Sequence, residues 1–439
     1  MWSYFSTIFT VGAGLILLPF ILHKMPQEVV GLWNIFATIA ALVMMLDFGF
    51  RVTFTRNISY IFSGVKKLQK EGVSHIDANA SVDYSLLKGA LIAMRQFYRW
   101  MAIGAFVLLS TAGTAYFYYI LQKYSYDKLD ALIAWILLIA INSYNLYTYY
   151  YDALLIGKGL IKRTQQINIL GQTIYIGVAI VLIYSGFGLT AIVGSQLISI
   201  IIRRILIYRS FFTPELKKHI QYVEPQDPKE IFNTITPNAI KIGLTQLGGF
   251  LVTKSAILIG SAFLTLEEIA CYGITIQAMD ILSRCATVFY NSYTPKLAQC
   301  RVENNIQQLR HYYLICICSM LIIFLIGGVA WIFLGEWALG LIQSQTHFLP
   351  PVMIAVLLAV NALEQNHAIS AGFILADNKI PFFIPSLISG AATIVLLFLF
   401  LGICDLGIWS LILAPGLAQL AYQNWKWPSV VIKEFTQTR

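Results

Sequence analysis

Hydrophobic residues follow one another in long runs, and clusters of charged residues separate these runs. Cutting the chain at the charged clusters leaves apolar segments of about 18 to 25 residues, which is the length that an α-helix needs to cross roughly 30 Å of hydrocarbon. The pattern predicts twelve membrane-spanning helices, at residues 4–22, 30–50, 99–121, 130–152, 166–185, 188–208, 234–260, 267–291, 312–334, 350–375, 381–401 and 406–424. We therefore expect an all-α polytopic membrane protein.

The composition agrees with a chain that lies mostly in lipid. Hydrophobic residues make up 58% of the 439 positions and charged residues only 12%, whereas a soluble chain is about half apolar and about a quarter charged. No Lys or Arg precedes the first apolar run, and no small-residue cleavage site follows it. This run is therefore expected to be a retained helix and not a signal peptide.

The basic residues predict the orientation, because cytoplasmic loops are enriched in Lys and Arg. With both termini placed in the cytoplasm, 25 of the 30 basic residues fall on the inner side, Lys24, Lys123 and Lys128 fall outside, and Lys241 and Lys254 lie within the seventh span. The net charge of +9 then follows from topology. Because the basic residues are dispersed over short loops, a nucleic-acid partner is not expected.

The predicted spans divide into two groups of six. We expect an N-terminal lobe at residues 1–208, a cytoplasmic loop between the lobes at 209–233, a C-terminal lobe at 234–424 and a cytoplasmic tail at 425–439.

Two short internal matches support this division. Asp47 and Arg51 match Asp280 and Arg284 at an offset of 233 residues, with an acid four residues before an arginine in both places. A second match at an offset of 219 residues pairs Asn142 with Asn361 and Asn145 with Glu364. Equal helix numbers in the same orientation favour two parallel six-helix repeats with a central ligand cleft between them.

Four acidic or titratable residues within the spans are candidates for ion coupling. An ionised side chain deep in a bilayer costs at least about 2.5–3.5 kcal/mol, so such residues usually face protein or a wet cavity. These candidates are Asp47, Asp280, Glu364 and His367. Glu364 with His367 one turn later could load and release a proton, or the two could belong to a structural hydrogen-bond cluster. Asp47 with Arg51 and Asp280 with Arg284 could equally be intrahelical ion pairs.

Four basic residues are candidates for a cationic cavity that binds an anionic cargo. Arg51 and Arg284 carry the planar guanidinium fork that suits phosphate. Lys241 and Lys254 lie on nearly opposed faces of the seventh span, so they can line one cavity only if that helix bends, which Gly248 and the adjacent glycine would permit. The alternative for both lysines is snorkelling to an interface.

Other residue patterns give no indication of an enzyme. A run of tyrosines in the fourth span is typical of an interfacial belt, or could contact cargo; it comprises Tyr144, Tyr147, Tyr149, Tyr150 and Tyr151. The six cysteines show no metal-ligand spacing, so no metal is expected. The sequence also contains no phosphate loop, zinc signature or nucleophile elbow.

With these features, the sequence resembles the Wzx-type O-antigen flippases of the multidrug, oligosaccharidyl-lipid and polysaccharide (MOP) exporter superfamily. The resemblance rests on the twelve-helix layout, on Leu46-Asp47-Phe48-Gly49 with Arg51 and Arg56 at the end of the second span, and on Gly157-Lys158-Gly159 after the fourth.

The resemblance implies a fold, a function and partners. The fold would be MATE-like, with two six-helix lobes, and the protein would move an undecaprenyl-diphosphate-linked oligosaccharide from the inner to the outer leaflet of a bacterial plasma membrane. Alternating access would be driven by a proton or sodium gradient without a bound cofactor. The lipid-linked oligosaccharide and membrane lipids would be its partners, together with a polysaccharide polymerase and a chain-length regulator of O-antigen or lipopolysaccharide synthesis.

Two other functions stay open on the sequence. A multidrug or cation exporter of the same superfamily would share the fold, but it would favour acids over bases in its cavity. A membrane-embedded polysaccharide polymerase or glycosyltransferase would be expected to carry a large outer loop with catalytic residues, whereas no predicted outer loop exceeds about sixteen residues.

Overall fold

The computed structural model describes residues 16–68, 81–302, 305–375 and 381–437. Within these residues the chain forms helices and no strands. It divides into two compact units, of which the first contains residues up to 25 and 39–246, and the second contains residues 26–38 and 247–439. The division passes through two helices, α2 (Gln27–Met45) and α11 (Pro228–Thr253), so each of these helices contributes residues to both units.

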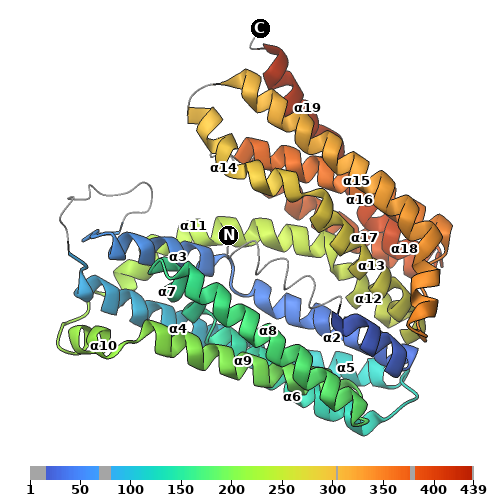
Figure 1. The fold of residues 1–439 in the computed structure, drawn as a ribbon, viewed down its shortest axis with the longest axis horizontal. Coiled ribbons are helices and arrows are strands. Elements are labelled where there is room, and N and C mark those ends of the chain that lie inside the picture. Colours follow the sequence, from blue (N-terminus) through green and yellow to red (C-terminus); the bar gives the residue numbers. More distant parts are fainter. Residues whose placement is uncertain (1–15, 69–80, 303–304, 376–380, 438–439) are drawn as a thin grey trace. The chain divides into compact units, whose positions relative to one another are not determined.

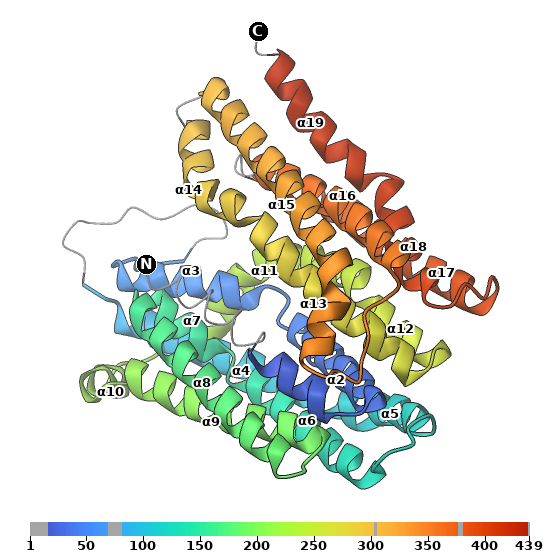
Figure 2. The same cartoon turned by 45° about the vertical axis from the view of Figure 1, so that its right-hand side comes forward.

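The N-terminal unit is a bundle of long helices in which neighbours along the chain pack side by side. Figures 1 and 2 both show α8 lying along α9, and α6 also packs against α9. Besides a helical segment at 16–24, its elements are α3 (Phe50–Phe62), α4 (Tyr84–Leu108), a π-helical turn (Leu109–Gly113), α5 (Thr114–Leu121), α6 (Lys128–Tyr147), α7 (Tyr150–Gly157), α8 (Ile161–Tyr184), α9 (Leu189–Phe211) and α10 (Pro214–Gln221).

The C-terminal unit contains a second bundle, in which α15 packs along α16 and α17 along α18 (Figure 2). Its elements are α12 (Ser255–Phe263), α13 (Leu266–Ala286), α14 (Val288–Val302), α15 (Ile306–Leu341), α16 (Pro351–Leu375), α17 (Phe383–Gly402), α18 (Trp409–Leu420) and α19 (Gln423–Gln437).

Nine helical segments of the described chain are long and apolar enough to cross a membrane, and each overlaps one predicted span. They are Gln27–Met45, Tyr84–Leu121, Lys128–Gly157, Ile161–Tyr184, Leu189–Phe211, Gly243–Phe263, Ile306–Leu341, Pro351–Leu375 and Phe383–Gly402. Together they make the chain a multi-pass membrane protein.

Three predicted spans are not among these nine segments. Residues 4–15 of the first lie outside the described residues, and 16–24 are helical. The span 267–291 corresponds to α13, which carries two glutamates in its first turn as well as Asp280 and Arg284. The span 406–424 corresponds to α18, which has only 12 residues. The total of twelve spans therefore stays a prediction.

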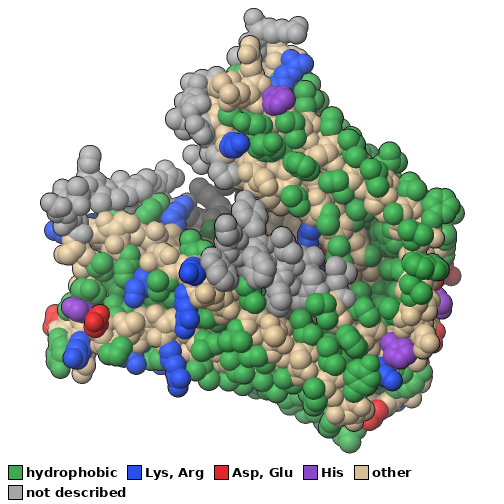
Figure 3. All heavy atoms as spheres, viewed as in Figure 1, with side chains coloured by type: hydrophobic (Ala, Val, Ile, Leu, Met, Phe, Trp, Pro, Cys, Tyr) green, Lys and Arg blue, Asp and Glu red, His purple; other side chains and the backbone are tan. Residues whose placement is uncertain are grey.

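Large apolar side chains cover the outside of both bundles, as lipid-facing surfaces require. Figure 3 shows hydrophobic side chains over much of the visible surface of each unit. On α15 the exposed side chains form a nearly continuous stripe, which includes Leu321, Ile322, Leu325, Ile326, Val329 and Phe333. Lys and Arg side chains of the N-terminal unit gather toward the end that carries α10 (Figure 3).

Helices extend into segments that were expected to be loops or a tail. The predicted tail after residue 424 forms α19, in which Trp427, Val431 and Phe435 recur every four residues and are buried. This apolar stripe packs α19 against α16, because one face of a helix is buried when apolar residues repeat at this spacing. The loop expected at 209–233 contains α10 and the first turns of α11.

The second span is interrupted where α2 gives way to α3. Phe48 and Gly49 both have positive φ values, 44° and 71°, and this left-handed conformation separates α2 from α3. Gly243 of α11 lies directly against this turn, since a Cβ atom on Gly243 would come within 2.5 Å of the Phe48 Cα atom. Only glycine permits this approach of α11 to the broken helix.

Gly248, the first glycine of the pair in the seventh span, has a packing role. A Cβ atom on Gly248 would lie 2.7 Å from the carbonyl carbon of Ser386, and a Cβ atom on Gly390 would lie 3.1 Å from the Gly248 carbonyl oxygen. These contacts bring α11 and α17 close together. α11 continues through the glycines, and the helix is interrupted at Lys254, between α11 and α12.

Candidate functional site

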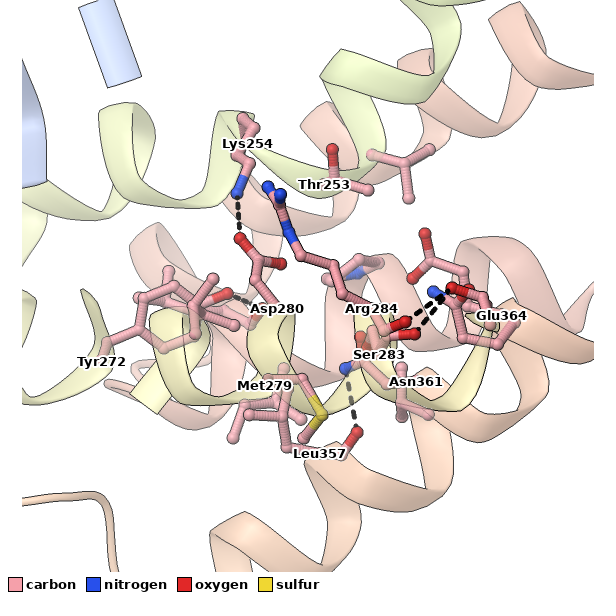
Figure 4. Close-up of a pocket in the computed structure, with 18 residues that line it drawn as sticks. Thr253, Lys254, Tyr272, Met279, Asp280, Ser283, Arg284, Leu357, Asn361 and Glu364 are labelled. Carbon is pink, nitrogen blue, oxygen red and sulfur yellow. Dashed lines mark hydrogen bonds and ion pairs between the residues drawn. The ribbon is translucent and has the colours of Figure 1, made fainter. Parts of the chain in front are cut away.

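A cavity of about 320 Å³ lies within the C-terminal unit. Four of the eight candidate residues line it, namely Lys254, Asp280, Arg284 and Glu364. Figure 4 shows that they come from different helices: Lys254 from the junction of α11 and α12, Asp280 and Arg284 from α13, and Glu364 from α16. The tertiary structure therefore gathers two bases and two acids that are up to 110 residues apart in sequence.

Asp280 pairs with Lys254 and not with Arg284. The Lys254 Nζ atom lies 3.1 Å from the Asp280 Oδ2 atom. Lys254 occupies the N-cap position of α12, where the helix is interrupted, and this break lets its side chain reach across to α13. The intrahelical pair of Asp280 and Arg284 expected from their spacing is thus wrong, because a cation from another helix takes the carboxylate.

Arg284 and Glu364 are the two remaining charges of the cavity. Within the described residues, neither the Arg284 guanidinium nor the Glu364 carboxylate has a hydrogen bond or an ion pair with another side chain. Both side chains line the cavity (Figure 4). The cavity thus presents one internally neutralised pair and two charges of opposite sign that are free to meet a ligand.

Neutral polar groups and apolar side chains complete the wall. The hydroxyl groups belong to Thr253, Ser283 and Thr287, and the amides to Asn361 and Gln365. Apolar walls come from residues such as Met279, Leu357, Val360, Leu411 and Ile412. Small-ligand sites commonly combine a largely apolar wall with a few polar groups that fix orientation.

His367 lies away from this cavity. Its Nδ1 atom is 2.8 Å from the Asn424 Oδ1 atom, so it links α16 to α19. Glu364 lines the cavity and His367 does not, and the proton-loading pair of the two residues stays a prediction. A separation of three residues on a helix places side chains near one another but does not make them share a site.

In the N-terminal unit, the Asp47 side chain lies at the start of α3. Its carboxylate accepts hydrogen bonds from the Arg51 backbone N–H at 3.1 and 3.2 Å and from the Tyr98 hydroxyl at 2.5 Å. The Asp47 side chain is buried, at 7% exposure. The Asp47 carboxylate forms no ion pair with the Arg51 side chain in the described structure, because the break between α2 and α3 turns the backbone N–H group of Arg51 toward the carboxylate.

The Arg51 side chain lies over an aromatic ring. Its guanidinium carbon is 4.7 Å from the centre of the Tyr149 ring. The same ring has the Arg204 guanidinium carbon at 6.0 Å. Tyr149 belongs to the tyrosine run that was expected to form an interfacial belt or to contact cargo. In the structure its ring lies beside the guanidinium groups of Arg51 and Arg204.

A buried ion pair in the N-terminal unit was missed by the sequence analysis. Arg204 Nη1 donates to Asp152 Oδ2 at 2.9 Å, and Arg204 Nη2 donates to Asn145 Oδ1 at 2.6 Å. The two charged side chains are only 4% and 7% exposed. The signal was present, since Asp152 lies between apolar residues at the end of one span and Arg204 lies inside another.

Lys241 completes the candidate set. It lies on α11, and its side chain is outside the described part of the structure. The candidates thus fall into separate places: Lys254, Asp280, Arg284 and Glu364 at the cavity of the C-terminal unit, and Asp47 and Arg51 in a polar cluster of the N-terminal unit.

Comparison with known proteins gives the fold. No protein-family model and no curated relative matches the sequence. Among solved structures, the chain is similar to an inward-facing multidrug resistance MATE family transporter of the MOP superfamily, with 15% identity, coverage of 99% of this chain and 96% of that one, and a TM-score of 0.69.

Two further solved structures have the same architecture. The lipid II flippase MurJ in an inward closed conformation matches with 12% identity, coverage of 98% and 86%, and a TM-score of 0.63. A MOP superfamily transporter from Pyrococcus furiosus, described as having a binding pocket of reverse polarity, matches with 15% identity, coverage of 98% and 95%, and a TM-score of 0.57. The chain therefore has the fold of the MOP superfamily over nearly its whole length.

Proposed function

We propose that this protein is a flippase that moves a lipid-linked oligosaccharide from the inner to the outer leaflet of a bacterial plasma membrane by ion-coupled alternating access. The observation that carries the proposal is the unpaired Arg284 guanidinium in a cavity that also presents hydroxyl and amide side chains. An anionic, hydroxyl-rich cargo needs this combination, because charge-assisted and neutral hydrogen bonds then replace its hydration.

Physical constraints on such a cargo agree with the fold. A polar head group needs a wet path through roughly 30 Å of hydrocarbon, whereas a polyprenyl tail can stay in lipid. The similarity to the lipid II flippase MurJ supports a cargo of this class. Arg51 and Lys241 remain candidates for contact with the diphosphate.

Among the proposed coupling residues, Glu364 is favoured. The Asp47 carboxylate accepts hydrogen bonds from the Tyr98 hydroxyl and from the backbone N–H group of Arg51. Asp280 is paired with Lys254, and His367 is bonded to Asn424. Among the four, only Glu364 has no hydrogen bond or ion pair with another described side chain, so a proton or sodium ion would meet an available carboxylate there.

The test is transfer of radiolabelled undecaprenyl-diphosphate oligosaccharide across vesicles that contain the purified protein, with and without an ion gradient. We expect protein-dependent transfer that the gradient accelerates, and we expect Arg284→Gln to slow it at least tenfold. Arg163→Gln, which removes an exposed arginine of the N-terminal unit, is the matched control. Absence of transfer by folded, oriented protein would contradict the flippase function.

A multidrug exporter is the second candidate, and the unpaired Glu364 carboxylate favours it, because it would suit a cationic drug. The same vesicles distinguish the two functions. Gradient-driven uptake of a cationic dye without transfer of the lipid-linked oligosaccharide would establish the exporter.

A further inference from the structure

The charges of the cavity in the C-terminal unit sum to zero. Lys254 and Asp280 neutralise each other across 3.1 Å, and Arg284 and Glu364 add one charge of each sign. In the described structure, Arg284 and Glu364 form no ion pair with each other, although both side chains line the same cavity. The protein therefore offers a separated positive and negative group to whatever enters.

This separation restricts the charge of a well-matched ligand. An anion would pair with Arg284 but would also be repelled by Glu364, and a cation would have the reverse problem. A ligand with both charges pairs with both groups and leaves the occupied cavity neutral. A neutral cavity avoids the free-energy cost of an unpaired charge inside a membrane.

The remaining wall indicates the rest of the ligand. Thr253, Ser283, Thr287 and Gln365 line the cavity. The Thr253 and Thr287 hydroxyls donate to backbone carbonyls and can accept hydrogen bonds from ring hydroxyls. The volume of about 320 Å³ is at the lower end of the roughly 300–1,000 Å³ of small-molecule sites. It suits one substituted sugar and not a whole oligosaccharide.

We propose that this cavity binds one zwitterionic sugar residue of the cargo, with Arg284 receiving its phosphate or carboxylate and Glu364 its ammonium group. The proposal rests on the proposed function in taking a saccharide as cargo. It adds that the glycan carries both charges on or beside one sugar. The coupling cation and the ammonium group of the sugar would then bind to the Glu364 carboxylate in different steps of the transport cycle.

The experiment measures binding of four soluble sugars to the full chain in lipid nanodiscs by calorimetry. The probes are glucosamine 6-phosphate, glucose 6-phosphate, glucosamine and glucose, which carry both charges, the negative charge, the positive charge and no charge. We expect glucosamine 6-phosphate to bind at least tenfold more tightly than each of the other three.

Two variants separate the contributions of the two charges. Glu364→Gln should remove the preference for glucosamine 6-phosphate over glucose 6-phosphate, because the ammonium group loses its partner. Arg284→Gln should remove the preference over glucosamine. Glu215→Gln and Arg163→Gln, which change exposed residues of the N-terminal unit, should retain both preferences. Each variant is first shown to keep the wild-type melting temperature within a few degrees.

Three results would overturn the proposal: equal binding of glucose 6-phosphate and glucosamine 6-phosphate, equal binding of glucosamine and glucosamine 6-phosphate, or no binding of any probe at millimolar concentration. Because binding is measured without transport, the two proposals fail separately. If the protein prefers the zwitterionic sugar but does not transfer the lipid-linked oligosaccharide, the proposed binding site is supported and the flippase function is contradicted. If it transfers the oligosaccharide without this preference, the flippase function is supported and the proposed site is contradicted.

Discussion

Arg204 donates a 2.9 Å hydrogen bond to Asp152 from a position where both side chains are almost completely buried. A second nitrogen of the same guanidinium bonds to Asn145. The pair joins α7 to α9 inside the N-terminal unit. It is a structural element, because each ion depends on the other to remain charged away from water.

We predict that Arg204→Met lowers the free energy of unfolding by about 3–5 kcal/mol, because the buried Asp152 carboxylate loses the arginine that donates a hydrogen bond to it. Unfolding in detergent micelles measures the loss. The double variant Asp152→Leu/Arg204→Met should recover most of it, since an apolar pair often replaces a buried ion pair without cost. Arg209→Met, at an exposed position on the same helix, is the control, and an equal loss there would contradict the prediction.

The pair of Lys254 and Asp280 should behave differently. Its side chains are 31% and 51% exposed, so solvent screens their attraction. We predict that Lys254→Met changes the free energy of unfolding by less than about 1 kcal/mol, measured in the same micelles. A loss as large as that of Arg204→Met would show that the Lys254 pair also holds the fold together.

Tyr98 donates a hydrogen bond to the Asp47 carboxylate at the start of α3. Removing its hydroxyl takes a hydrogen bond from the buried Asp47 carboxylate, and we expect Tyr98→Phe to cost about 1.5–3 kcal/mol of stability. Tyr118→Phe provides the matched control, because Tyr118 is 64% exposed. Equal melting temperatures for the two variants would argue against a stabilising role of this bond.

The Arg51 guanidinium carbon lies 4.7 Å from the centre of the Tyr149 ring, so the ring can hold this side chain in place. If Arg51 contacts the diphosphate, Tyr149→Leu should raise the KM for lipid-linked cargo about two- to fivefold, from the roughly 0.5–1 kcal/mol of a cation–π contact. Tyr149→Phe keeps a ring and should leave the KM near the wild-type value. Transfer rates at varied cargo concentration test this, and equal effects of the two substitutions would exclude the ring as the cause.

Glu364→Gln should abolish the acceleration of transport by an ion gradient, because the amide cannot bind and release a proton or hold sodium as a carboxylate does. The measurement is the ratio of transfer rates with and without the gradient, which should fall to one. Glu215→Gln should retain the wild-type ratio. A wild-type ratio in Glu364→Gln would remove Glu364 from coupling.

The sequence by itself determined that the chain is a multi-pass helical membrane protein and where most of its spans lie. These properties depend on local runs of apolar residues, because any segment of sufficient length must form a helix to satisfy its backbone in lipid. The unusual charges within the spans could also be found from sequence, since their cost makes them conspicuous.

Tertiary structure decided which of these charges meet. Spacing along one helix paired Asp280 with Arg284 and Asp47 with the Arg51 side chain, but Lys254 reaches Asp280 from a neighbouring helix and a helix break turns backbone N–H groups toward Asp47. The pair of Asp152 and Arg204 joins residues 52 positions apart. Which charged side chains pair depends on how the helices pack and on where they are interrupted. The spacing of residues along the sequence gives neither of these.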